Sequence, residues 1–124
     1  MSGRGHRDIF AADIAWGKGS SDGIDYARFL MDEGNGASPL IILSKFAPGE
    51  VVEPHTHAAN CFEYVIAGRQ TVGKATFGPG DIRIVKGGTG YGPITIGPEG
   101  CSVLIVFQEA AGAMAESLPR KSAA

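Results

Sequence analysis

Two histidines one residue apart, His55 and His57, form the first pattern in the chain that could do chemistry. In a strand, side chains at positions i and i+2 point to the same face, about 7 Å apart at Cα. Both imidazoles could then bind one metal ion, with about 2.0–2.1 Å between nitrogen and zinc. The pair alone is weak support for a metal site, because two histidines on a solvated strand edge give the same pattern.

Two further residues, Cys61 and Glu63, are candidates for the same site. A thiolate binds zinc and ferrous iron strongly, and binding would deprotonate the Cys61 thiol. Glu63 stands two residues later, so in a regular strand it points to the same interior face. An interior carboxylate needs a partner. Glu63 is therefore interpreted as a metal ligand, as a general base, or as the ion-pair partner of Arg69 or Arg83.

Short strands joined by tight turns must hold these residues in place. The chain of 124 residues contains 19 glycines and 7 prolines, mostly between short apolar runs, which favours strands over long helices. Several runs are apolar on both faces, as in strands buried between two layers, and the pattern predicts an all-β antiparallel sandwich or small barrel. Gly73 and Lys74 are expected to form a two-residue hairpin turn. The expected strands are 26–31, 40–46, 51–53, 62–67, 70–72, 75–77, 82–85, 93–96 and 102–108.

The chain is long enough for one domain with a core of its own. We place this domain at residues 9–109. Residues 1–8 are expected to be a disordered N-terminal tail, and residues 110–124 a flexible C-terminal tail with at most a short helix before Pro119. Cys101 begins the last expected strand and is interpreted as a small core residue.

Composition and charge exclude several classes of partner. The net charge is −2 and the eleven Lys and Arg residues are scattered, so no surface for nucleic acid or for an anionic membrane is expected. The longest apolar runs, 39–43 and 103–107, are too short to span a bilayer. The first residues, MSGRGHRD, are not followed by the apolar core of a signal peptide. A cytoplasmic location is therefore predicted, where a Cys61–Cys101 disulfide is not expected.

The spacing of the candidate residues resembles two motifs of the cupin superfamily. Residues 49–68, GEVVEPHTHAANCFEYVIAG, are similar to the first motif, G-x5-H-x-H-x3,4-E-x6-G. Residues 80–91, GDIRIVKGGTGY, are similar to the second, G-D-x4-P-x-G-x2-H, and the resemblance covers roughly residues 38–108. It implies a cupin jelly-roll barrel of two antiparallel sheets, commonly a homodimer. In that family the two histidines and the glutamate of the first motif, with the histidine of the second, bind one divalent metal inside the barrel.

Carried over by position, the resemblance implies His55 and His57 as metal ligands. Cys61 stands where the family has glutamate, Tyr91 stands where it has histidine, and Lys86 replaces a proline. Cys61 would then complete the ligand set for iron, zinc, nickel or manganese, with water or Tyr91 at an open position. Thiol dioxygenases, which are also cupins, carry cysteine in place of that glutamate, crosslinked in some to a tyrosine, but they hold iron with three histidines.

Three functions are compatible with these residues. The first is a metal-binding enzyme that acts on a small organic molecule by dioxygenase or isomerase/lyase chemistry, with Glu63 and Tyr91 as catalytic groups. The second is a metal-independent isomerase or cyclase, as some members of the superfamily are, in which His55 or His57 is the base and Tyr91 the acid. The third is a non-catalytic module that binds a small ligand. The sequence favours the first and does not identify the substrate.

Overall fold

The computed structural model describes residues 5–118, and its regular structure is almost entirely β. Two 3-10 helices accompany the strands, η1 (Ala11–Asp13) and η2 (Ala110–Gly112). No helix among residues 5–118 is long and apolar enough to cross a membrane. The strands are β1 (Gly17–Lys18), β2 (Ile24–Leu30), β3 (Leu40–Phe46), β4 (Val51–Val52), β5 (His55–Thr56), β6 (Cys61–Val72), β7 (Ala75–Phe77), β8 (Ile82–Val85), β9 (Ile94–Phe107) and β10 (Glu116–Ser117).

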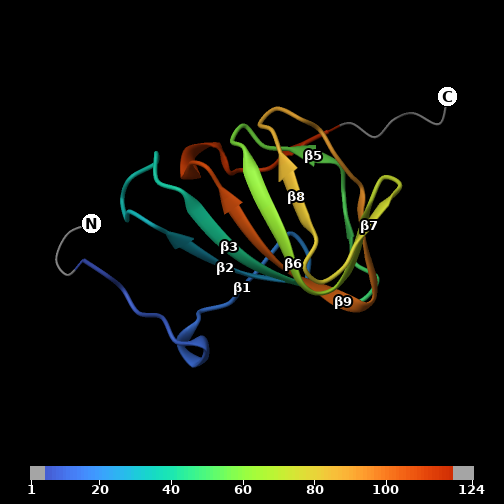
Figure 1. Ribbon diagram of the computed structural model, residues 1–124, viewed down its shortest axis with the longest axis horizontal. Helices are drawn as coiled ribbons and strands as arrows, with labels where there is room; N and C mark the ends of the chain where they lie inside the picture. The colour runs from blue at the N-terminus through green and yellow to red at the C-terminus, as the bar shows by residue number, and fades with distance from the viewer. Residues whose placement is uncertain (1–4, 119–124) are drawn as a thin grey trace.

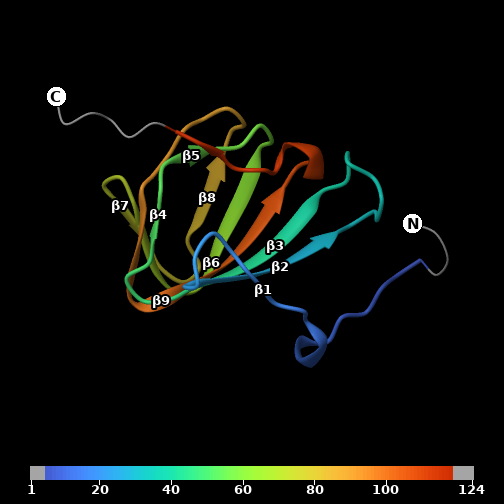
Figure 2. The same ribbon diagram turned by 180° about the vertical axis from the view of Figure 1, so that it is seen from behind.

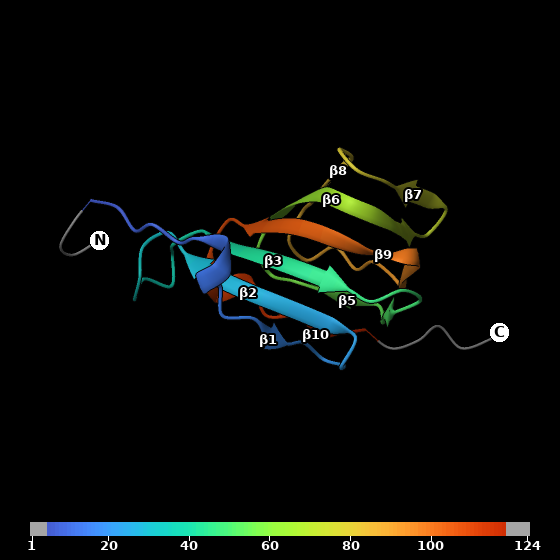
Figure 3. The same cartoon turned by 90° about the horizontal axis from the view of Figure 1, so that it is seen from below.

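The strands form two antiparallel sheets, as the sequence predicts. The large sheet has the order β1-β2-β3-β9-β6-β7, with β8 paired to β6 (Figure 1). β4 pairs with the first part of β9, as the view from behind shows (Figure 2). The second sheet consists of β5 and β10. Seen from below, β1, β2, β3, β9 and β6 follow one another across the large sheet (Figure 3). Within residues 5–118 the sheet does not close into a hydrogen-bonded barrel.

Two pairs of expected strands are single long strands in the structure. The runs 62–67 and 70–72 belong to β6, and the runs 93–96 and 102–108 fall mostly in β9. The glycines that suggested breaks instead allow close approach of the two strands. A Cβ added at Gly68, which has a φ of +78°, would lie 2.0 Å from the carbonyl oxygen of Gly100. The expected hairpin at Gly73 and Lys74 is confirmed, because Val72 pairs with Ala75 across it.

A β-bulge in β6 decides which of its residues face the interior. Between Val65 and Ala67, β6 carries one residue more than β9. Side chains alternate along a strand, and an extra residue shifts that alternation by one. Buried positions therefore change from odd numbers, such as Glu63, to even numbers, such as Gln70. The bulge brings Glu63 and Gln70 to the same face although they are seven residues apart.

The core has two apolar clusters on the inner face of the large sheet. The sulfur of Cys101 is part of the second cluster, as expected for a small core residue. The first cluster contains Leu40, Ala59, Cys61, Phe107 and Ala113. The second contains Val65, Ile94, Ile96, Cys101 and Val103.

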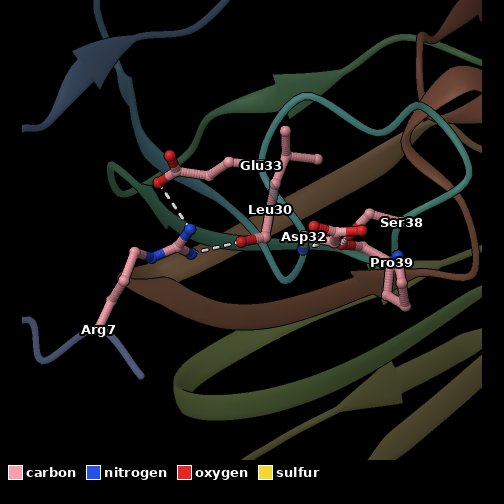
Figure 4. Close-up of polar contacts among 6 residues, drawn as sticks. All are labelled: Arg7, Leu30, Asp32, Glu33, Ser38 and Pro39. Carbon is pink, nitrogen blue, oxygen red and sulfur yellow. Dashed lines mark hydrogen bonds and ion pairs between the residues drawn. The ribbon is translucent and has the colours of Figure 1, made fainter. Parts of the chain in front are cut away.

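The N-terminal segment is attached to the edge of the large sheet by Arg7. Its guanidinium lies 2.6 Å from Glu33 Oε1 and also donates to the Leu30 carbonyl (Figure 4). Next to it, Ser38 Oγ accepts a hydrogen bond of 2.8 Å from the Asp32 amide. Residues 1–4 of the predicted N-terminal tail lie outside the described residues.

The segment after β9 returns across the inner side of the sheet. Ala59 N donates to Gly112 O at 2.9 Å, and Leu118 N donates to Pro54 O at 3.1 Å. Between them, β10 pairs with β5, which carries His55. Residues 110–118 thus lie against the strand that holds the histidines, whereas residues 119–124 lie outside the described residues. The domain bounds 9–109 stay a prediction.

Candidate functional site

A cavity of about 690 Å³ lies between the large sheet and the segment 110–115. Its wall is mostly apolar, and its volume is in the range of small-molecule sites. The apolar wall includes Ile24, Leu40, Ile42, Phe46, Val52, Ile94, Val103, Ile105, Phe107 and Met114. The polar side chains on the wall include Tyr26, Arg28, Ser44, His55, His57, Glu63, Gln70 and Tyr91.

His55 and His57 both face this cavity, and each is held by a backbone carbonyl. His55 Nδ1 lies 2.9 Å from Glu53 O, and His57 Nδ1 lies 2.7 Å from Ala113 O. A carbonyl only accepts hydrogen bonds, so each Nδ1 carries the proton and a neutral ring keeps its lone pair on Nε2. The ring centroids are 4.9 Å apart and nearly perpendicular, at 88°. Each ring on the cavity wall therefore has an Nε2 atom that can accept a proton or bind a ligand.

Tyr91 is brought to the histidines by backbone pairing. Tyr91 and His55 exchange two backbone hydrogen bonds, both of 3.0 Å. The Tyr91 ring centroid is 4.7 Å from that of His55 and 6.3 Å from that of His57. Burial, and then the negative charge of Glu63, raise the pKa of the Tyr91 phenol well above its ordinary value. The hydroxyl is thus protonated at neutral pH, as a proton donor must be.

Glu63 lies on the cavity floor in a buried ion pair. Its Oε1 accepts hydrogen bonds from Arg83 Nη1 at 3.1 Å and from Gln70 Nε2 at 3.3 Å. The side chains of Glu63 and Arg83 are 7 % and 12 % exposed, and the two residues are directly opposite in the β6–β8 pair. Of the two arginines that the sequence offered as ion-pair partners of Glu63, it is Arg83 that forms the pair. The Arg83 guanidinium also lies over the Tyr91 ring, 4.7 Å from its centroid.

Cys61 shares the inner face of β6 with Glu63 but does not line the cavity. It is 4 % exposed and packs in the first core cluster. Burial, and then the negative charge of Glu63, raise the pKa of its thiol to about 11. Within residues 5–118, no three His, Cys, Asp or Glu side chains form a group that could hold a metal. Among the described residues, His55, His57 and Cys61 are thus not gathered into one such group, and their assignment as metal ligands stays a prediction.

Three contributors to the site were not identified from the sequence. Gln70 reaches Glu63 only because of the bulge in β6, which no local pattern marks. The carbonyl of Ala113 has no side-chain signal. The Phe107 ring, 4.7 Å from the centroid of His57, resembles any other apolar residue of a buried strand. The one indication in the sequence was that Phe107 ends an apolar run, 103–107, which the fold places beside the two inward-facing histidines.

Comparison with known proteins yields matches only among solved structures: no family model matches the sequence, and no curated protein does. The polyketide cyclase RemF from Streptomyces resistomycificus superposes with a TM-score of 0.75 at 15 % identity, over 94 % of this chain and 88 % of RemF. KdgF from Halomonas sp. superposes with a TM-score of 0.67 at 19 % identity, over 84 % of this chain and 94 % of KdgF. An RmlC-like cupin protein from Ralstonia eutropha JMP134 superposes with a TM-score of 0.68 at 15 % identity, over 83 % of this chain and 68 % of that protein.

The chain has the cupin fold. Within it, the segment that resembles the first cupin motif runs from the turn before β4 to the bulge in β6. The segment that resembles the second motif contains β8 and ends at Tyr91. The cupin fold thus explains why residues 36 positions apart, such as His55 and Tyr91, become neighbours.

Both cysteine thiols should be unreactive in the folded protein. Burial raises the pKa of Cys61 and Cys101 to about 11, so little thiolate is present near pH 8. We expect a disulfide reagent to modify both at least about a hundredfold more slowly in buffer than in denaturant. The reaction is followed by absorbance. A cysteine that reacts fast in the folded protein and is protected by added zinc would contradict this expectation and would support Cys61 as a ligand.

Stability should fall as the pH drops below about 6.5. Burial is the main cause that lowers the pKa of His57, although the Ala113 carbonyl opposes it. Below that pH the unfolded state therefore binds more protons than the folded state at this residue, and the free energy of unfolding decreases. Urea unfolding at about pH 7 and pH 5 should show a smaller decrease for His57→Gln than for the wild type. Equal decreases in the free energy of unfolding of the two proteins would contradict a lowered pKa of His57 as the cause.

Proposed function

We propose that this protein is a metal-independent enzyme of the isomerase or cyclase type, which moves a proton within a small and mostly apolar organic molecule. The observation that carries the proposal is that His57 and Tyr91 line the same mostly apolar cavity, with their ring centroids 6.3 Å apart. His57 is the base and Tyr91 the acid. His55, whose Nε2 also faces the cavity, is the second base.

In the proposed step a C–H bond next to a carbonyl group breaks. The proton goes to Nε2 of His57, and the electron pair moves onto the carbonyl oxygen, which accepts a hydrogen bond from Tyr91. The carbonyl of Ala113, 2.7 Å from His57 Nδ1, stabilises the imidazolium that forms. In an isomerisation, His57 returns the proton to another carbon of the conjugated enolate. In a cyclisation, the enolate carbon attacks a second carbonyl group, and the alkoxide that forms takes the proton back from His57. The mostly apolar wall strengthens both polar interactions.

The buried ion pair lies beside the acid. The guanidinium of Arg83, 4.7 Å from the centroid of the Tyr91 ring, lowers the pKa of the phenol, although burial and Glu63 raise it by more. Glu63 fixes that guanidinium and balances its charge in the resting site. This arrangement supports Glu63 as a positioning residue rather than as the base that the sequence suggested.

The fold neighbours support an enzyme without identifying its substrate. RemF is a polyketide cyclase, and the superposition covers 94 % of the present chain at 15 % identity. That identity is too low to carry a reaction from one protein to the other. A small-molecule enzyme is therefore a proposal that rests on the cavity and its polar groups.

Hydrogen exchange into a simple ketone tests the proposal. β-Tetralone, an apolar bicyclic ketone with acidic protons beside its carbonyl, is incubated with the protein in deuterated water and followed by NMR. We expect deuterium to enter at least about a hundredfold faster than with the same concentration of imidazole, because general base and acid act together. A rate equal to that of imidazole or of the unfolded chain would contradict the proposal. Binding without exchange would favour the non-catalytic module.

A metal enzyme, with iron, zinc, nickel or manganese, is the second candidate. The observation that favours it is the orientation of His55 and His57, because ligating histidines also donate their other N–H to a carbonyl or carboxylate. These two residues would hold the ion, which would supply Lewis-acid or redox chemistry. Elemental analysis of protein purified without an affinity tag or chelator separates the candidates. Near one equivalent of a transition metal per chain would favour the metal enzyme.

We also propose that the protein is a homodimer through the outer face of β6 and β8. Tyr64 is 36 % exposed, Ile66 and Ile82 are each 50 % exposed, and Ile84 is 79 % exposed on this face. We expect sedimentation to give about twice the chain mass of 12.9 kDa, and Ile84→Glu to give the monomer. Lys74→Glu, an exposed change in the β6–β7 turn, is the control. A monomeric wild type would contradict the dimer. The cytoplasmic location stays a prediction.

A further inference from the structure

A second polar cluster lies on the cavity wall formed by β2 and β3. Arg28 and Ser44 both line the cavity there. Ser44 lies opposite Tyr26 in the β2–β3 pair, and Arg28 is two residues beyond Tyr26 on the same face of β2, about 7 Å away at Cα. The Tyr26 ring also lines the cavity, but its hydroxyl leans over Gly17 on β1, away from Ser44. The Arg28 guanidinium and the Ser44 hydroxyl can therefore reach one small group.

None of these three side chains is used by the protein itself. Within residues 5–118, no hydrogen bond or ion pair joins Tyr26, Arg28 or Ser44 to another protein group. Glu63, the carboxylate on the wall, is paired with Arg83, and Glu33, the acidic residue near Arg28, is paired with Arg7. Arg28 is thus the unpaired charge of the cavity, at its exposed edge.

Ser44 shows that the cluster is directed into the cavity. The residue is only 6 % exposed, and a buried hydroxyl without a partner is costly. No side-chain nitrogen or oxygen of the described residues is both fully buried and without a hydrogen-bond partner. Because Ser44 Oγ has no partner in the protein, its open surface must face the cavity that the residue lines.

We propose that Arg28 and Ser44 form a subsite for a carboxylate group of the substrate. The proposal rests on the proposed function, since it assigns the substrate class of the same cavity. The Ser44 hydroxyl can donate one hydrogen bond, the guanidinium only donates, and its fork matches the two oxygens of a carboxylate. A phosphate would bring a second negative charge to a mostly apolar wall that offers one free cation. The substrate class is therefore an apolar carboxylic acid.

The register of the sheet sets the distance between this subsite and the catalytic end. Arg28 lies opposite Ile42, Ile42 opposite Ile105, and Ile105 opposite Glu63. Three strand spacings separate Arg28 from Glu63, about 14 Å along the sheet. Tyr91 lies near Glu63, because the Arg83 guanidinium contacts both side chains. A substrate with its carboxylate at Arg28 and its carbonyl group at Tyr91 therefore has a body of the size of one or two rings between them.

Binding of matched naphthalene derivatives tests the subsite by calorimetry. We expect naphthoate to bind at least about tenfold more tightly than naphthamide, which has the same shape and no charge. Arg28→Met should reduce the preference to less than about twofold, and Arg28→Lys should keep part of it. Ser44→Ala should weaken naphthoate binding severalfold. Arg69→Met, at an exposed position outside the cavity wall, should leave the affinities for naphthoate and naphthamide unchanged. Circular dichroism checks that each variant is folded.

Several results would overturn the subsite. These are equal affinity for naphthoate and naphthamide, no binding of either, an unchanged preference in folded Arg28→Met, or tighter binding of naphthyl phosphate than of naphthoate. The test is independent of catalysis, because naphthoate has no proton to exchange beside its carboxylate. If β-tetralone is not exchanged but the naphthoate preference depends on Arg28, the proposed reaction fails and the subsite stands. If exchange occurs without a carboxylate preference, the subsite fails alone.

Discussion

Glu63→Ala should lower the free energy of unfolding by about 3–5 kcal/mol. The substitution leaves the Arg83 guanidinium, whose side chain is 12 % exposed, without its carboxylate partner. It also removes the acceptor of the Gln70 amide. An uncompensated buried charge is among the most destabilising changes in a folded protein. Urea unfolding followed by circular dichroism measures the difference.

Two control variants separate the lost ion pair from a lost contact. Glu63→Leu combined with Arg83→Leu removes both charges, and we expect this protein to recover most of the stability. Glu33→Ala breaks the exposed pair with Arg7 and should cost only about 0–1 kcal/mol. If Glu63→Ala costs less than about 1 kcal/mol, the buried pair does not have the importance for stability assigned to it here.

Tyr91→Phe should lower the rate of deuterium entry into β-tetralone by at least about a hundredfold. The substitution keeps the ring that contacts His55 and Arg83 and removes only the hydroxyl, so the fold and the binding of naphthoate should be unchanged. His57→Gln should have an effect of similar size, because it removes the base. Tyr64→Phe, the same chemical change on the outer face of β6, is the matched control.

The pH dependence of the same rate tests the roles of the two residues. Because the pKa of the Tyr91 phenol is well above its ordinary value, the rate should not fall between about pH 7 and pH 9. Because the pKa of His57 is lowered, the rate should decrease only on the acid side of about pH 6.5. A rate that falls as the pH rises from 7 to about 9, or an unchanged rate in Tyr91→Phe, would contradict the assignment of the acid.

Local periodicity predicted an all-β antiparallel fold, and the resemblance to the two cupin motifs predicted the jelly roll. The i, i+2 spacing of His55 and His57 is local, whereas Tyr91 was named by its position in the second motif; the structure brings all three to one cavity. The inward direction of Cys61 and Glu63 follows from alternation along β6.

What the sequence did not predict depends on distant segments. Alternation points Cys61 inward, but it does not show that the residue packs in a core cluster with Leu40, Phe107 and Ala113. The choice of Arg83 over Arg69 depends on the β6–β8 register. The part of the chain placed in a tail contributes the Ala113 carbonyl to His57 because β10 pairs with β5, and such pairing leaves little trace in a segment rich in alanine.

The most direct test of the central claim is the rate of deuterium entry into β-tetralone before and after metal removal. The protein is dialysed against a strong chelator, its metal content per chain is measured, and the rate is determined with and without added zinc, iron, nickel or manganese. We predict the same rate in every sample, because His57 and Tyr91 act without an ion. A rate that disappears with the metal and returns with one of these ions would contradict the claim and establish the metal enzyme instead.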